Sequence, residues 1–311
     1  MITNAAGVEI GGTEGLPRRR AKRSVWIYVG IAVVLYMGFS ILDKMITNPN
    51  FGWPVVAEFL FNPAIMTGLV FALWMMVVTM VIGVAIGTLL AVMRTSRSAV
   101  VSQAAWAYIW FFRGTPLLVQ IIFWFNIAAL FPQLELGIPF GPAFIGIDSN
   151  ALITPMSAAI LALGLNEAAY MAEIIRGGLL GVDKGQDEAA RALGMKPPMV
   201  FRIVFPQAIR IIIPATANQV INAFKNTSLL SVIGVADLLY SAQIIYSDNF
   251  QTIPLLIVAS FWYLLTTSFL GYGQGRLEKR YSRGFTSRKH KPKISEIEID
   301  SRDSMTGVHR D

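Results

Sequence analysis

Long apolar runs separated by short polar segments dominate the pattern along this chain. Most of the runs are at least as long as the roughly 20 residues that a helix needs to cross the hydrocarbon core of a membrane. They occupy residues 25–42, 64–93, 106–130, 156–175, 208–235 and 253–271. The pattern therefore predicts an all-α, polytopic membrane protein with about six transmembrane helices.

The composition points the same way and removes several kinds of chemistry. The 311 residues are 54% hydrophobic and only 14% charged, whereas soluble domains carry about 25% charged residues. Cysteine is absent, and the two histidines, His290 and His309, lie in the polar C-terminal segment. Disulfides and thiolate chemistry are thereby excluded, and little remains for a metal site or for histidine catalysis. We therefore expect no catalytic residue, no metal and no cofactor of the chain's own.

Basic residues gather beside particular ends of the apolar runs. The clusters lie at residues 18–23, at 94–97 after the second run, at Arg176 after the fourth, and at 276–283 after the sixth. Because Lys and Arg mark cytoplasmic loops, this pattern places both termini in the cytoplasm and requires an even number of spans. The net charge of +7 is thus explained by membrane orientation rather than by nucleic-acid binding.

The first apolar run has the length of a secretory signal peptide. However, Asp43, Lys44 and Met45 follow it where small residues would mark a cleavage site. We therefore expect residues 1–24 to be a cytoplasmic tail and residues 25–42 to be a retained, extra span. The charged residues 276–311 are expected to form a disordered cytoplasmic tail.

A polar stretch between the fourth and fifth runs has a design of its own. Residues 186–193 are strong helix formers, and Gly194 ends them. Pro197 and Pro198 are expected to force a turn, after which residues 199–205 form a second, more apolar short helix. The charge pattern places this pair of helices in the cytoplasm. An ordinary amphipathic loop is the alternative interpretation.

Four motifs carry a family resemblance. They are EAARALG at 188–194 followed by IVFP, FFRGTPLLVQ at 111–120, YMAEIIRG at 170–177, and KNTSLLSVIGV at 225–235, which has Asn226 where Asp is more usual. In this order they resemble the permease subunits of polar amino-acid ATP-binding-cassette (ABC) importers, the histidine, glutamine and glutamate permease-like family. The resemblance implies a permease domain over residues 60–275, with its coupling loop, the EAA loop, at 177–207.

The resemblance also implies partners. The EAA loop of this family docks on the ATPase subunits, and the residues that the motif assigns to this contact are Asp187, Glu188, Ala189, Ala190, Arg191 and Gly194. The chain has no G-x-x-x-x-G-K-[ST] motif, so ATP would be bound by a separate ATPase dimer. A periplasmic or extracellular solute-binding protein would deliver a polar amino acid, either glutamate- or glutamine-like or another polar or basic one. A second permease copy, identical or merely similar, would complete the path in the plasma membrane.

Polar residues inside the apolar runs are candidates for that path. An ionisable group in hydrocarbon costs about 2.5–3.5 kcal/mol on insertion scales, so each one needs a reason. The predicted path residues are Glu173, Asn218, Asn222, Lys225 and Thr227. Residues with a predicted structural or gating role are Arg113, Gly114, Pro116, Glu167 and Arg176. For Glu173, an ion pair with Arg176 or Lys225 that locks two helices is the equally supported alternative.

Two other classes of protein fit the apolar pattern. An ion-coupled secondary transporter would use the intramembrane acids for proton or sodium coupling, although it would be expected to contain internal repeats, and none is clear. A membrane-anchored assembly protein would have no path at all.

Overall fold

The computed structural model describes residues 25–137 and 143–281. The chain divides into two compact units, residues 1–51 and 52–311. In the first unit, helix α1 (Val25–Thr47) and the short 3₁₀ helix η1 (Pro49–Phe51) contain no buried residue. The predicted tail at residues 1–24 lies outside the described residues.

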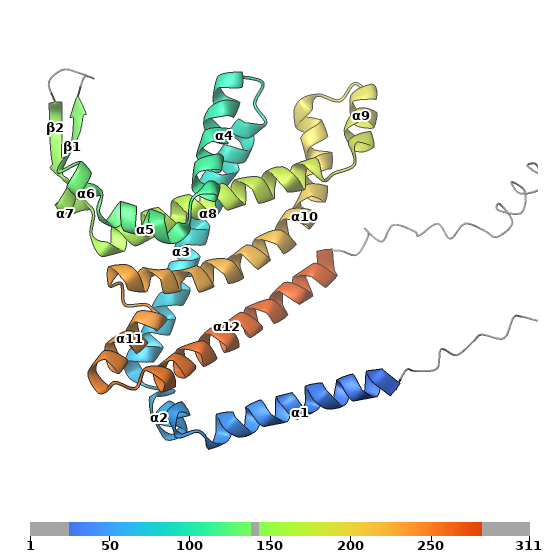
Figure 1. The fold of residues 1–311 in the computed structure, drawn as a ribbon. Coiled ribbons are helices and arrows are strands. Elements are labelled where there is room, and N and C mark those ends of the chain that lie inside the picture. The colour runs from blue at the N-terminus through green and yellow to red at the C-terminus, as the bar shows by residue number, and fades with distance from the viewer. Residues whose placement is uncertain (1–24, 138–142, 282–311) are drawn as a thin grey trace, which may run out of the picture. The chain divides into compact units, whose positions relative to one another are not determined.

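The second unit is built almost entirely from helices (Figure 1). Its elements are α2 (Trp53–Phe59), α3 (Pro63–Arg94), α4 (Ala99–Gly114), α5 (Leu117–Phe125), α6 (Ile127–Leu130), β1 (Gln133–Gly137), β2 (Ala143–Asp148), α7 (Ser149–Leu152), α8 (Pro155–Leu180), α9 (Lys184–Ala192), α10 (Pro197–Asn226), η2 (Thr227–Ile233), α11 (Leu238–Asn249) and α12 (Thr252–Tyr281). The strands form a small antiparallel hairpin between α6 and α7.

Within the described part of the chain, five helices are long and apolar enough to cross a membrane, and the bent pair α4–α5 makes six. Many large apolar side chains on these helices are exposed, as is required where the solvent is lipid. The predicted all-α, polytopic class with about six spans is therefore confirmed.

The centre of the second unit is the contact between α3 and α8. A Cβ added at Gly83 would lie 2.9 Å from Glu167 Cβ, and one at Gly87 would lie 2.7 Å from Met171 Cβ. Glycine at both positions therefore lets the two helices approach closely, as small residues do in membrane helix pairs. Helix α8 begins with a capping box in which Thr154 and Ser157 bond each other's backbone N–H.

Helices α10, α11 and α12 pack around the N-terminal half of α3. Phe224, Leu238 and Leu255 come from these three helices and are fully buried in one cluster with residues of α3. Asp237 caps α11 by accepting from Tyr240 N at 2.8 Å, and it accepts from the Tyr263 hydroxyl at 3.0 Å. Burial raises the pKa of this carboxyl, and the hydrogen bonds oppose the shift.

Several predicted boundaries are wrong for identifiable reasons. Pro197 and Pro198 start α10 rather than preceding it, because the first helical turn needs no intrahelical N–H donor. The separate short helix expected at 199–205 is therefore the first part of α10, which continues through Pro206 and Pro214. Residues 236–252, which separate the fifth and sixth predicted runs, contain a further helix, α11. Helix α12 extends to Tyr281, so the first residues of the expected tail at 276–311 are helical, and the rest lies outside the described residues.

Candidate functional site

The third predicted span is broken in the middle. Helices α4 and α5 meet at an angle of 101°, and the residues between them, Thr115 and Pro116, are extended. Pro116 has no backbone N–H and disfavours a helical residue before it, so a break at this point follows from the sequence. The run at 106–130, predicted as one span, is therefore divided between separate helices.

Two buried amides replace the backbone hydrogen bonds that the break removes. Gln120 Nε2 donates to Phe112 O at 2.9 Å and to Thr115 O at 3.1 Å. From α8, Asn166 Nδ2 donates to Phe112 O at 2.9 Å and to Gln120 Oε1 at 3.1 Å. The break is thus fixed against α8 by side chains that have almost no exposure.

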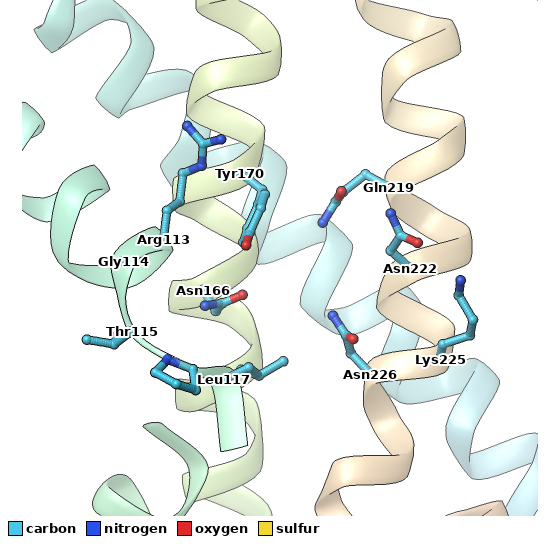
Figure 2. A pocket seen from close by; sticks show the side chains of 11 residues that line it. Arg113, Gly114, Thr115, Leu117, Asn166, Tyr170, Gln219, Asn222, Lys225 and Asn226 are labelled. Atoms are coloured by element: carbon cyan, nitrogen blue, oxygen red, sulfur yellow. The ribbon is translucent and has the colours of Figure 1, made fainter. Parts of the chain in front are cut away.

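A polar pocket of about 640 Å³ lies between the break, α8 and α10. Figure 2 shows side chains reaching into it from these three elements. The lining residues are Arg113, Gly114, Thr115, Pro116, Leu117, Asn166, Tyr170, Gln219, Asn222, Lys225 and Asn226. Two are cations, four are amides, and none of these described lining residues is an acid. In a helical membrane protein, such a concentration of polar groups marks a binding or conducting site.

Glu167 lies directly behind the pocket wall. Its side chain is 1% exposed, and its Oε2 accepts from Gln219 Nε2 at 2.7 Å. Its Oε1 has no hydrogen-bond partner among the described residues. Glu167 therefore joins α8 to α10 through a residue that lines the pocket.

A second cavity of about 470 Å³ shares Arg113, Gly114 and Tyr170 with the first. Here Glu173 accepts from Arg176 Nε at 3.1 Å and from Arg176 Nη2 at 2.7 Å. Arg113 Nη1 lies 3.8 Å from the same carboxylate, and its guanidinium lies 5.3 Å from the centre of the Tyr170 ring. Arg113 thus stands at the junction of the two cavities, paired with the one acid in the lining of the second.

The structure separates the predicted path residues. Asn222 and Lys225 line the pocket, whereas Glu173 lies in the second cavity and pairs with Arg176. Because Arg176 is three residues further along the same helix, α8, this ion pair does not lock two helices as the structural alternative proposed. Contrary to expectation, Asn218 is on an exposed face outside the lining. Thr227 is fully buried and donates to Phe224 O at 2.9 Å.

Of the residues with a predicted structural role, three line the pocket and two do not. Arg113, Gly114 and Pro116 belong to the lining, while Glu167 lies behind it and Arg176 lies in the second cavity.

Six lining residues were not predicted. They are Thr115, Leu117, Asn166, Tyr170, Gln219 and Asn226. A signal for most of them was present, because Asn166 and Tyr170 are four apart, and Gln219, Asn222 and Asn226 follow at intervals of three and four. Each set therefore forms one polar stripe on an otherwise apolar helix.

In the loop between α8 and α10, the first helix ends at the predicted glycine. Gly194 has a φ of +72°, and its N–H binds Arg191 O while Met195 N binds Ala190 O, the Schellman pattern that ends helices at a left-handed glycine. Ala190 is buried, and Glu188, Ala189 and Arg191 are exposed. The side chain of Asp187 lies outside what the structure describes. In Figure 1, α9 and the first turns of α10 lie together beyond the end of α8.

Comparison with known proteins gives consistent matches. A family model described as "Binding-protein-dependent transport system inner membrane component" matches residues 83–283. The arginine transport system permease protein ArgU of Corynebacterium glutamicum is 42% identical over 277 residues, which cover 88% of this chain and 84% of that protein. The glutamine transport system permease protein GlnP of Escherichia coli is 33% identical over 230 residues, covering 73% and 94%. A crystal structure of an amino acid ABC transporter with histidines matches with a TM-score of 0.62 and 35% identity, covering 72% of this chain and 97% of that one.

Proposed function

The chain belongs to the binding-protein-dependent transport system inner membrane components and is a permease of the amino-acid ABC importers; from that premise we propose that a polar amino acid crosses the membrane through the pocket between α4, α5, α8 and α10. The observation that carries this proposal is the pocket itself. Its volume of about 640 Å³ lies within the usual range of small-molecule sites, about 300–1,000 Å³.

The pocket has the chemistry to hold an amino-acid carboxylate. Arg113 presents a planar guanidinium that can bind a carboxylate through two parallel hydrogen bonds. Lys225 adds a second positive charge to the lining. Arg113 shares its charge with Glu173 of the second cavity, 3.8 Å away, but the described lining of the pocket itself holds two cations and no acid. An anionic group is therefore the favoured occupant of this side of the pocket. The side chain of the substrate would be glutamate- or glutamine-like, or another polar or basic group.

Energy would come from outside this chain. We assign the docking of an ATPase dimer to α9 and the start of α10, with Glu188, Ala189, Arg191 and Gly194 at the contact. The exposed apolar side chains of Leu193, Met199 and Phe201 beside them support this assignment, because exposed apolar clusters outside the lipid are typical of protein interfaces. ATP would be bound and hydrolysed by the partner subunits, and this chain would need no cofactor.

The remaining partners follow from the same proposal. Both termini would be cytoplasmic, in agreement with the basic clusters at the ends of α3 and α12. A solute-binding protein would deliver the amino acid at the outer face. A second permease, either an identical copy or a similar chain, would stand beside this one in the plasma membrane.

A pair of asparagines four residues apart allows a matched test. Asn222 lines the pocket, whereas Asn218 is exposed outside it. In liposomes containing the complete importer, Asn222→Leu should lower ATP-dependent uptake of L-arginine or L-glutamine by about tenfold or more, since a hydrogen bond to a charged group contributes about 1.5–3 kcal/mol. Asn218→Leu should transport nearly as well as the unchanged chain. Equal loss in both variants, or uptake by this chain without an ATPase, would contradict the proposal.

A further inference from the structure

Glu167 is enclosed by protein on the side away from the pocket. Gly83 of α3 lies so close that a Cβ there would come within 2.9 Å of Glu167 Cβ and 3.2 Å of its carbonyl carbon. On the other side, Gln219 Nε2 donates to Glu167 Oε2 at 2.7 Å. A buried acid normally requires a full set of donors. Besides Gln219, Asn226 also contacts the Glu167 side chain, but Glu167 Oε1 has no partner at normal hydrogen-bond geometry among the described residues.

The contact between Glu167 and Gln219 determines which way the amide of Gln219 points. Glu167 Oε2 accepts the hydrogen bond from Gln219, so the amide presents its NH₂ group to the acid. In a planar amide the carbonyl oxygen then faces away from Glu167. Because Gln219 also lines the pocket, this oxygen is the polar atom of the side chain that remains for a ligand there.

The orientation of the Asn166 amide is also fixed, but by other hydrogen bonds. Its Nδ2 donates to Phe112 O and to Gln120 Oε1, which uses both N–H groups of the amide. Its carbonyl oxygen is therefore left for the pocket. Figure 2 shows Asn166 and Gln219 reaching toward one another from α8 and α10, with the Tyr170 hydroxyl on the same side as Asn166.

We infer that Glu167 is a positioning residue that turns Gln219 so that the amide oxygens of Gln219 and Asn166 form an acceptor site for a primary ammonium group. This inference rests on the proposed function and adds to it. Arg113 would take the carboxylate of the amino acid, and the two oriented oxygens would take its α-ammonium. The pocket would thus select against a ligand that has the carboxylate and side chain of an amino acid but lacks the ammonium.

The test uses pairs of ligands that differ only in that group. L-Arginine and L-glutamine are each compared with the 2-hydroxy acid in which a hydroxyl replaces the ammonium. Equilibrium binding is measured on the permease–ATPase complex in nanodiscs, without the solute-binding protein, so that only the membrane site is read. The unchanged complex should prefer at least one of the amino acids over its hydroxy analogue by about tenfold or more.

Glu167→Gln should reduce that preference to about threefold or less, because a neutral amide can donate or accept and no longer fixes Gln219. Affinity for the hydroxy analogue should change by less than about twofold. Gln219→Met should have the same effect, and the double variant should lose no more than either single one, as residues acting as a unit do. Glu58→Gln, which alters an exposed acid on α2, is the control and should keep the full preference.

Three results would overturn the inference, and they differ in meaning. If Glu167→Gln keeps the full preference, Glu167 does not position Gln219. If it weakens both members of a pair equally, its role is purely structural. If the unchanged complex binds neither amino acid, the proposed transport site itself fails.

Discussion

Replacing Asn166 by leucine should destabilise the protein by removing the anchor of the α4–α5 break. The substitution keeps a side chain of similar size but removes the donors to Phe112 O and Gln120 Oε1. Phe112 O would still accept a hydrogen bond from Gln120 Nε2 at 2.9 Å. Gln120 Oε1, in a side chain that is only 4% exposed, would lose its donor.

The size of the effect follows from these contacts. Side-chain hydrogen bonds between membrane helices contribute about 0.6 kcal/mol each on average, so two contribute about 1.2 kcal/mol. A buried acceptor left without a partner adds about 1–3 kcal/mol. The total of about 2–4 kcal/mol should lower the melting temperature by roughly 4–16 °C, on the scale for domains of about 200 residues.

The assay is thermal unfolding of the purified chain in detergent, followed by the loss of the monodisperse peak. Asn126→Leu is the matched control, because Asn126 is exposed at the end of α5 and donates only to Ile122 O, one turn back. It should melt within about 2 °C of the unchanged chain, as surface changes do. If Asn166→Leu melts like the unchanged chain, or if the control falls as far, then the amides do not hold the break.

Three further predictions follow from other contacts. Gly87→Ala should destabilise the protein by about 1–3 kcal/mol, because its new Cβ would lie within 2.9 Å of the backbone of α8. Gly271→Ala is the control and should leave the stability unchanged, because no atom lies within 4 Å of its new Cβ. Equal melting temperatures of the two variants would refute the close α3–α8 contact. Glu173→Gln should change stability by only about 1 kcal/mol or less, since its ion pairs are partly exposed. It should nevertheless lower ATP-dependent uptake, because it releases Arg113 from its ion pair. Unchanged uptake would count against a role for the Arg113–Glu173 pair. Glu188→Lys should abolish most amino-acid-stimulated ATP hydrolysis while the chain still purifies intact, and near-normal stimulation would argue against α9 as the docking element.

The sequence was sufficient for the class of the fold and for most of the spans. Hydropathy alone located the long helices, because the lipid requires about 20 apolar residues and leaves no other structure for the backbone. The end of α9 was also predicted correctly, since a left-handed residue at that position favours glycine, and Gly194 adopts it.

Other features depend on contacts that hydropathy does not reveal. Nothing in the polarity of residues 236–252 distinguishes a loop from α11, which is helical because Asp237 caps it and Leu238 and Ala242 are buried against α3 and α12. Likewise, Asn218 and Asn222 have the same side chain on one helix, and only the packing of α10 decides which of them faces the pocket. Hydropathy does not single out Gln219 either, because its partner, Glu167, lies 52 residues away in the sequence, on α8.

The central claim is that an amino acid occupies the pocket between α8 and α10. The chain contains no cysteine, so Asn222→Cys and Asn218→Cys each introduce a unique thiol whose rate of maleimide labelling can be measured in the assembled importer. Saturating L-arginine or L-glutamine should slow labelling of the Asn222→Cys variant several-fold and leave the Asn218→Cys variant unaffected. If neither amino acid alters the labelling of Asn222→Cys, or if both variants respond alike, the pocket is not the transport site.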